Sequence, residues 1–250
     1  MTRRRWIADE WTESTASLLG AQAAHLARVL RARVGQQFDV VTGGSVRRGE
    51  VVSVTGDRVE FALHEPIQAT APLPLTMALG IVRFERMEWA IEKLTELGAA
   101  RIVPLIAQRS EKHLAQAAAK RVERWRKIAR EAAQQSRRSQ VPEISEAMHL
   151  QQYVVGPDRV PKSLRLLLSE REQEITLREW VEQNGSTQQI SQPPTGNIYA
   201  AVGPEGGWSD SEIDVFAKHG WQSVGLGPQI LRTETAAIAV ASVLGNSWGD

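Results

Sequence analysis

The chain has 250 residues, 42% of them hydrophobic and 24% charged, which suits a globular protein of one large or two small domains. The absence of cysteine excludes disulfides, thiolate zinc sites, iron–sulfur clusters and a cysteine nucleophile, and the five histidines lack ligand-like spacing, so we expect no metal site. The net charge is +1. No segment approaches the ~20 apolar residues of a membrane span, so we expect a cytoplasmic protein.

The first 65 residues are predicted to be mostly β-structure. Short strands are expected at residues 38–43 and within residues 51–65, where two strands meet across Gly56-Asp57, and one short helix is expected near residues 23–31. Residues 65–74, EPIQATAPLP, contain three prolines and are expected to form a linker. We therefore place a first domain at residues 1–70 and a second at residues 75–250.

The pattern changes at Leu75 to an alternation of apolar runs and helical segments. The runs are LTMALGI, RIVPLIA, LRLLLS, NIYAAVG and SVGLG. Strands that alternate with helices are typical of a mainly parallel sheet covered by helices. The second domain is therefore predicted to be of the α/β class.

Residues 120–138 are predicted to form a basic amphipathic helix. A three-to-four-residue spacing connects Val122, Trp125, Ile128 or Ala129, and Ala132, and the cationic residues fall on other faces. The surrounding segment, residues 73–140, has 14 Lys and Arg against 7 Asp and Glu, whereas residues 141–250 have 7 against 14. This segregation suggests a surface that binds a polyanion, although a solvated helix face explains the helix equally well.

Two glycine-rich turns follow predicted strands, at GPEGG (203–207) and GLGP (225–228). Neither fits the dinucleotide-binding fingerprint or the phosphate-binding loop of nucleotide hydrolases. Glu205 would repel a pyrophosphate, which favours a neutral or cationic ligand, although the glycines could also serve tight turns alone. Ser209 and Glu212 have the spacing of a capping box, which predicts a helix directly after the first turn.

The second turn leads into Arg232-Thr233-Glu234-Thr235 and then a helix of small residues. An arginine and a glutamate at a strand-to-helix turn could stabilise an anion and handle a proton, because open α/β sheets bind ligands there. A structural ion pair that caps the helix is the competing interpretation.

These motifs together resemble the RsmE family, the 16S rRNA uridine N3-methyltransferases of the SPOUT (trefoil-knot) class. The similarity runs nearly end to end, and VGPEGGWSDSEI and GLGPQILRTETAA are its most specific pieces. Further matches are HLARVLRARVGQ, RMEWAIEKLTELGAARIVPLIAQRS and RWRKIAREAAQQSRRSQVPEI. The resemblance implies an N-terminal PUA-like β-barrel that helps to hold RNA and a C-terminal α/β domain whose last part is knotted. It also implies S-adenosyl-L-methionine as cofactor, 16S rRNA or the small ribosomal subunit as partner, and a homodimer with composite active sites.

The family motifs assign roles to individual residues. Arg232 is expected to be an electrostatic stabiliser, Arg138 to hold the uracil or an adjacent phosphate, and Glu205 and Glu234 to be alternative proton acceptors. Residues expected to line the cofactor pocket are Leu168, Gly203, Glu205, Gly206, Leu226, Gly227, Ile230 and Leu231. Candidates for contacts with the RNA backbone are Arg5, Arg31, Arg109 and Lys112.

The residues are consistent with transfer to a ring nitrogen. Methylation at pyrimidine C5 typically uses a cysteine thiolate, and radical chemistry with this cofactor needs a cysteine-bound cluster. Because the chain has no cysteine, both routes are disfavoured. Transfer to N3 requires loss of a proton and stabilisation of a uracil anion, which an arginine can supply. N3 lies on the Watson–Crick edge, so the base must be unpaired.

The chain departs from the family pattern in two turns. Phe84 replaces a glycine before the Met-Glu pair, and Arg137 replaces a glycine in QQSRRSQVP, where Ser139 and Gln140 replace an asparagine and an arginine. The RNA contacts of both turns are therefore open.

Three other functions compete. A non-enzymatic RNA-binding protein would use the barrel and the basic helix without a cofactor. A SPOUT enzyme that acts on another position, such as a ribose 2′-oxygen, is the alternative within the class. A nucleotide- or NAD-dependent enzyme is disfavoured by the missing fingerprint and by Glu205.

Overall fold

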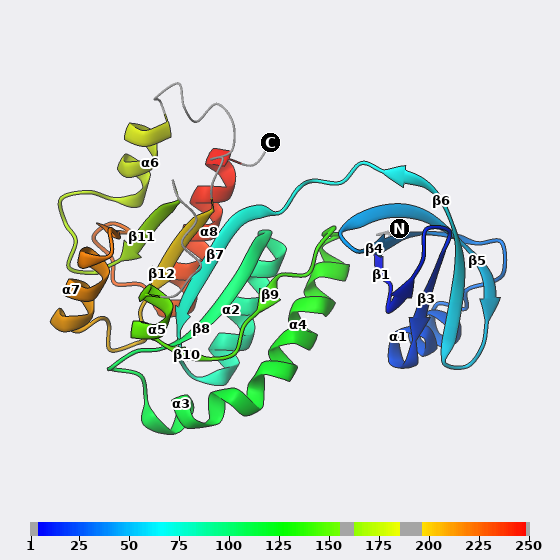
Figure 1. Ribbon diagram of the computed structural model, residues 1–250, viewed down its shortest axis with the longest axis horizontal. Helices are drawn as coiled ribbons and strands as arrows, with labels where there is room; N and C mark the ends of the chain where they lie inside the picture. The colour runs from blue at the N-terminus through cyan, green and yellow to red at the C-terminus, as the bar shows by residue number, and fades with distance from the viewer. Residues whose placement is uncertain (1–4, 156–162, 186–196, 249–250) are drawn as a thin grey trace. The chain divides into compact units, whose positions relative to one another are not determined.

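The computed structural model describes residues 5–155, 163–185 and 197–248 (Figure 1). It divides the chain into two compact units. Unit 1 comprises Met1–Pro72 and Arg130–Val141, and unit 2 comprises Leu73–Ala129 and Pro142–Asp250. Of the helices in the described part of the chain, none is long and apolar enough to cross a membrane.

Unit 1 contains a six-stranded sheet in the order β1-β4-β5-β6-β3-β2, in which only β1 and β4 run parallel. The strands are β1 (Trp6–Ile7), β2 (Glu10–Trp11), β3 (Thr15–Leu19), β4 (Gln37–Thr42), β5 (Ser45–Val54) and β6 (Arg58–Ile67). A short helix α1 (Gly20–Ala24) continues into a π-helical turn (His25–Val29). The hydrophobic core of unit 1 includes Trp6, Leu18, Leu26 and Phe61. The predicted β-rich region with one short helix and a turn at Gly56-Asp57 is confirmed.

The linker is shorter than predicted, because β6 continues to Ile67 and strand β7 begins at Leu73. Pro66 lies opposite Arg47 within the sheet. A proline, which has no N–H to donate, is tolerated there because the other neighbour of β6, strand β3, pairs only as far as Ala62. Composition alone therefore overestimated the linker at both ends.

The segment Arg130–Val141 belongs to unit 1 although it is distant from it in sequence. Ala133 packs with Ile7, Val41 and Val46 in a second buried cluster. Arg130 Nη2 donates to Asp9 Oδ1 at 2.7 Å. Apolar burial and an ion pair both hold this segment to the sheet of unit 1.

Unit 2 is built on a parallel sheet in the order β10-β8-β7-β12-β11-β13, with β9 beside β8. The strands are β7 (Leu73–Gly80), β8 (Ala99–Ile106), β9 (Glu143–Ile144), β10 (Met148–His149), β11 (Leu164–Leu168), β12 (Ile198–Val202) and β13 (Gln222–Val224). All five predicted apolar strands are present. Strand β12 is buried along its whole length, as expected for a parallel sheet covered on both faces.

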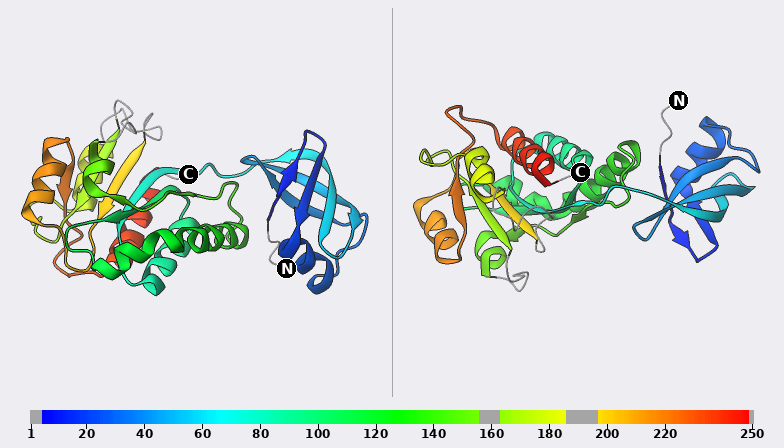
Figure 2. Two further views of the ribbon diagram at one scale, coloured as in Figure 1. Left: turned by 60° about the horizontal axis from the view of Figure 1, so that its bottom comes forward. Right: turned by 90° about the horizontal axis from the view of Figure 1, so that it is seen from above.

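Helices cover both faces of this sheet (Figure 2). Helix α8 (Thr233–Trp248) contacts α2 (Phe84–Glu96), α6 (Leu177–Gly185) and strands β7 and β12. Helix α5 (Leu150–Val155) packs with α7 (Asp210–Lys218) around Trp208, Phe216 and Trp221. A β-rich first unit and a parallel α/β second unit confirm the expected fold class, while the knotted threading of the last segment stays a prediction.

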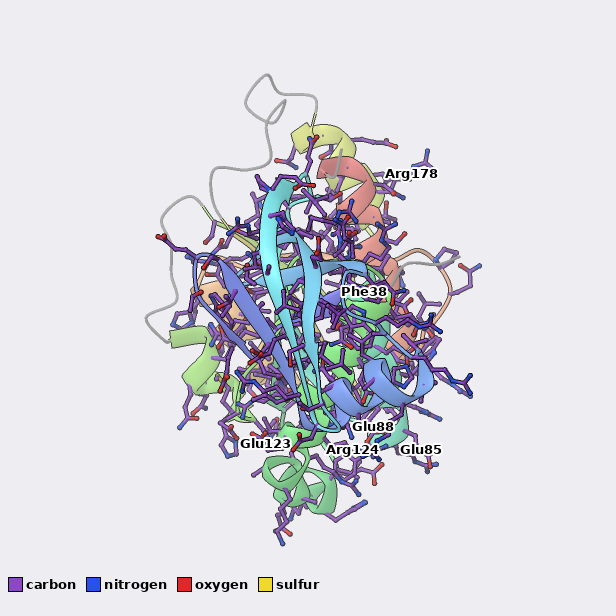
Figure 3. The ribbon with its side chains drawn as sticks, turned by 90° about the vertical axis from the view of Figure 1, so that its right-hand side faces the viewer. Phe38, Glu85, Glu88, Glu123, Arg124 and Arg178 are labelled. Atoms are coloured by element: carbon purple, nitrogen blue, oxygen red, sulfur yellow. The ribbon has the colours of Figure 1, made fainter. Side chains whose placement is uncertain are left out.

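The basic helix is observed as α4 (Val122–Gln135), after α3 (Lys112–Ala118) and a 3₁₀ turn (Ala119–Arg121). The predicted stripe is confirmed, since Val122, Trp125 and Ala132 are buried and Ile128 is half-buried. Arg124 joins α4 to α2 through two hydrogen bonds to the Glu88 carboxylate, at 2.5 and 2.7 Å (Figure 3).

Candidate functional site

A cavity of about 440 Å³ lies in unit 2 where strands β11, β12 and β13 end. Its walls come from the loops that follow these three strands, together with Arg86 from the first turn of α2. The carboxyl ends of parallel strands share one edge of the sheet, which is the usual ligand site of open α/β folds. A cavity of this volume can hold a small-molecule ligand.

The GPEGG loop is fastened to its neighbours by short hydrogen bonds. The Gly203 carbonyl accepts from Thr233 Oγ1 at 2.8 Å, and Trp208 Nε1 donates to the Leu168 carbonyl at 3.0 Å. A side chain at Gly80 would clash with the backbone of Pro204, so the end of β7 packs directly against this loop. These contacts tie the three loops of the cavity together.

The predicted capping box at the start of α7 is confirmed. Ser209 Oγ accepts from the Glu212 N–H, and Glu212 Oε2 accepts from the Ser209 N–H at 2.9 Å. Glu212 Oε1 also accepts from the Gln108 N–H at 2.7 Å. Glu212 therefore connects the loop after β8 to the helix that follows GPEGG.

The two candidate proton acceptors lie in different environments but share one cation. Glu205 lines the cavity, is partly exposed and forms an ion pair with Arg86 Nη1. The Glu234 side chain, in the first turn of α8, is only 6% exposed, and its Oε1 lies 3.7 Å from Arg86 Nε. Among the described residues, no group hydrogen-bonds Glu234 Oε2, which is also buried.

Sequence reasoning missed Arg86. A cation in the first turn of a helix opposes the helix dipole, so its presence there indicates a specific anionic partner. That signal was available in the RFERME segment, but the partner glutamates are 119 and 148 residues away.

Arg232 lies at the cavity wall with its side chain exposed. Its carbonyl accepts from the Ala236 N–H at 2.8 Å and so begins α8, but its guanidinium forms no ion pair with any described residue. The alternative of a structural Arg232–Glu234 pair is therefore not observed in the described part of the chain. The guanidinium is available to an anion that enters the cavity.

Most residues proposed for the cofactor line this cavity. They are Leu168, Gly203, Glu205, Leu226, Gly227, Ile230 and Leu231. Gly206 does not line it, and its carbonyl instead accepts from Arg109 Nη1 at 2.9 Å. Ile230 is 83% exposed, so an apolar ligand surface that covered it would gain free energy from its burial.

The proposed RNA contacts are divided between the units. Arg109 and Lys112 are exposed in unit 2, and Arg31 is exposed in unit 1. Arg5 is buried in unit 1 and donates to the Arg137 carbonyl, and burial together with the charge of Arg137 lowers the pKa of its guanidinium. Arg5 thus supports the turn after α4, and its burial leaves little surface for an RNA phosphate.

Arg138, proposed to hold the substrate, lies in the same turn of unit 1. Its N–H donates to the Ala133 carbonyl at 2.9 Å, and partial burial lowers the pKa of its guanidinium. Ser139 Oγ donates to the Thr70 carbonyl at 3.2 Å, and the Gln140 side chain lies against Gly44. The substituted residues of this turn therefore make contacts within unit 1.

The other departure, Phe84, is used for packing. Its ring stacks edge-on against Trp125, with 6.1 Å between centroids, and the Arg121 guanidinium lies 4.7 Å above it. The aromatic ring thus fastens the start of α2 to α4.

Comparison with known proteins agrees with this geometry. Residues 69–245 match the family model of an RNA methyltransferase domain, and residues 18–63 match an RNA methyltransferase PUA domain. Ribosomal RNA small subunit methyltransferase E of Synechocystis is 34% identical over 94% of this chain and 74% of that protein, and its Bacillus subtilis counterpart is 33% identical over 92% and 89%. The crystal structure of a Neisseria gonorrhoeae ribosomal RNA small subunit methyltransferase E bound to S-adenosyl methionine superposes with a TM-score of 0.83 at 29% identity, covering 99% of both chains.

Proposed function

The chain belongs to the family of ribosomal RNA small subunit methyltransferase E, and from this premise we propose that it methylates N3 of a uridine in 16S rRNA with S-adenosylmethionine. The observation that carries the proposal is the cavity at the ends of β11, β12 and β13, with Arg232 at its wall and no described residue in an ion pair with its guanidinium.

The residues of the cavity fit this cofactor, which supplies a methyl group on a positively charged sulfur. Leu168, Leu226 and Leu231 offer apolar walls, and Ile230 exposes an apolar side chain that a ring could cover.

The same residues suit a uracil that loses its N3 proton. Negative charge then develops on the ring, and the Arg232 guanidinium can stabilise it because it stays charged and has no other ion-pair partner among the described residues. Glu205 and Glu234 are the proposed proton acceptors. Arg138 is proposed to hold the uracil or a neighbouring phosphate.

The decisive experiment is mass-spectrometric mapping of modified nucleosides in small-subunit rRNA from cells that lack this protein. We expect one N3-methyluridine to disappear and to return when the wild-type chain is supplied. N3-methyluridine at the wild-type level in the deletion would refute the proposal. Loss of a 2′-O-methyl nucleoside instead would establish the alternative within the class.

Arg232→Ala is expected to lower methyl transfer by about 100-fold or more while leaving the fold intact, since one preorganised donor contributes about this much. Single-turnover methylation of rRNA and thermal unfolding measure the two effects. Arg178→Ala removes an exposed cation paired with Glu182 on α6 and is the matched control. Full turnover by Arg232→Ala would contradict the role.

The proposed assembly rests on the family resemblance alone. We propose a homodimer that works in the cytoplasm on the small ribosomal subunit or its rRNA. Analytical ultracentrifugation tests the dimer. Calorimetry with S-adenosylmethionine tests the competing function. A non-enzymatic RNA-binding protein would not bind this cofactor and would show no heat of binding.

A further inference from the structure

Glu170 lies in the turn that follows strand β11 and lines the cavity, and no sequence motif gives it a role. Hydrogen bonds fix the backbone of this turn. Ser169 is buried, its N–H donates to the Val224 carbonyl at 3.1 Å, and its Oγ accepts from the Arg171 N–H at 3.3 Å. The Glu172 N–H closes the turn by donating to the Ser169 carbonyl at 3.2 Å. The chain therefore holds Glu170 at a defined place on the cavity wall.

The carboxylate of Glu170 reaches the neighbouring loop of the cavity. Strands β11 and β12 are paired, so the turns that follow them lie side by side (Figure 1). Glu170 Oε1 is 3.0 Å from the place that a Cβ on Gly207 would occupy. Gly207 also lines the cavity and has a left-handed backbone, with φ of +66°. The carboxylate thus lies against the backbone of the GPEGG loop, at the wall of the cavity.

Of the two glutamates that line the cavity, only Glu205 has a partner within the described residues, the ion pair with Arg86. The Glu170 side chain is exposed, and no described residue forms an ion pair or a hydrogen bond with its carboxylate. An ionised carboxylate only accepts hydrogen bonds, so a ligand group that binds it has to be a donor.

S-adenosylmethionine offers three kinds of donor, which are the ribose hydroxyls, the ammonium group and the adenine amino group. Three arginines line the cavity against two glutamates, and this balance disfavours a further positive charge beside Glu170. The adenine amino group needs no charged acceptor, because a backbone carbonyl serves it equally well. Two neighbouring hydroxyls match the two oxygens of one carboxylate, and carboxylates near the carboxyl ends of parallel strands bind the ribose of adenosine cofactors in other α/β folds.

We propose that Glu170 binds the ribose hydroxyls of S-adenosylmethionine and so holds the adenosine half of the cofactor. This inference rests on the proposed function. Glu170 is a cofactor-binding residue, separate from Arg232 and from the proposed proton acceptors. It acts on every ligand that carries the same ribose, including the product S-adenosylhomocysteine.

The same turn offers a matched control. Glu172 lies two residues further along, is partly exposed and does not line the cavity. Its Oε1 accepts from the Glu174 N–H at 2.9 Å, and the amide oxygen of a glutamine can accept the same bond. Glu172→Gln therefore removes a carboxylate charge from this turn without touching the cavity.

The experiment is calorimetry on the full chain without RNA, for wild type, Glu170→Gln, Glu170→Ala and Glu172→Gln. The ligands are S-adenosylhomocysteine, 5′-methylthioadenosine, which has no ammonium group, and the 2′- and 3′-deoxy forms of each. Thermal unfolding of the ligand-free proteins shows which variants fold.

We expect Glu170→Ala to weaken the binding of both parent ligands about 10-fold, because a hydrogen bond to a charged group is lost. Glu170→Gln should lose part of this affinity, and Glu172→Gln should stay within twofold of wild type. At least one deoxy form of each ligand should bind wild type about 10-fold more weakly than its parent but bind Glu170→Ala as well as its parent, since the two changes remove the same interaction.

The inference is overturned if Glu170→Ala binds 5′-methylthioadenosine as tightly as wild type does, because the carboxylate then serves the ammonium group or no group at all. It is also overturned if the deoxy forms lose equal affinity in wild type and in Glu170→Ala, since the carboxylate then acts on another part of the ligand. A wild-type protein that binds neither parent ligand refutes the proposed function as well, so the two failures are distinguished.

Discussion

Arg137 adopts a left-handed backbone conformation, with φ of +59°, at the position where the family pattern has glycine. This conformation costs a non-glycine residue about 1–2 kcal/mol. The side chain offsets that cost, because Arg137 Nη2 lies 3.3 Å from Oδ2 of the buried Asp39, whose Oδ1 accepts from Arg48 at 2.7 Å. Arg5 further holds the Arg137 carbonyl.

We therefore expect Arg137→Gly to change the free energy of unfolding by less than about 1 kcal/mol, since it relieves strain and removes a partly exposed ion pair. Asp39→Ala should cost about 2–4 kcal/mol, because it removes the buried partner of two arginines. Urea denaturation measures both. Equal losses in the two variants would contradict this account of the turn.

The sequence predicted residue roles only where the alternation of strands and helices already places the residues at the same edge of the sheet. Glu205 and Arg232 could be placed at one edge because each follows a strand of one parallel sheet. Arg86 could not, since its pairing depends on β7 lying beside β12, which is a matter of strand order. The burial of Arg5 depends on the turn after α4, which lies more than 120 residues away in the chain.

At the scale of elements, the long amphipathic and apolar segments were predictable and the shortest elements were not. Strands β9 and β10 have two residues each, too few for an alternating pattern, and the π-helical turn at His25–Val29 has the same apolar spacing as an α-helix. The prolines of residues 65–74 indicated a linker, but Pro66 is accommodated at a free strand edge.

The contact between α2 and α4 makes stability depend on pH. The hydrogen bond from Arg124 lowers the pKa of Glu88 below its usual range. A carboxylate with a depressed folded-state pKa contributes its stability above the unfolded pKa of about 4.3 and loses it as pH falls through the folded value. Glu88→Gln should therefore cost about 1 kcal/mol at pH 7, and the difference from wild type should shrink as the pH falls below the unfolded pKa and through the lowered folded-state pKa.

Urea unfolding of wild type and Glu88→Gln between pH 3 and 7 checks this. Glu179→Gln is a useful comparison, because the backbone and hydroxyl of Thr176 lower the pKa of Glu179 on an exposed face of unit 2. A constant difference between wild type and Glu88→Gln across this range would show that the charge of Glu88 contributes nothing.

At the scale of the whole molecule, composition indicates only one of the places where the chain passes between the units. The proline-rich segment near residue 70 marks the first passage. The other two passages, near residues 129 and 141, have no comparable change in composition. The first of these falls inside the continuous helix α4, where nothing in composition changes. The segment Arg130–Val141 joins unit 1 because Ala133 is buried against that unit. A helical pattern predicts that Ala133 is buried but not which unit it packs against.

The basic excess of residues 73–140 predicts how the whole protein binds RNA. Exposed cations such as Arg109, Lys112, Lys120 and Arg121 release counterions when they neutralise phosphates, and each contact to a single strand contributes a slope of about −0.7 in log K against log salt. With four or more such contacts, the slope for a small-subunit rRNA fragment should be about −2.8 or steeper, and Lys112→Gln should make it shallower by about 0.7. Filter binding between 50 and 300 mM KCl measures the slope, and a flat dependence would show that this basic segment does not hold the RNA.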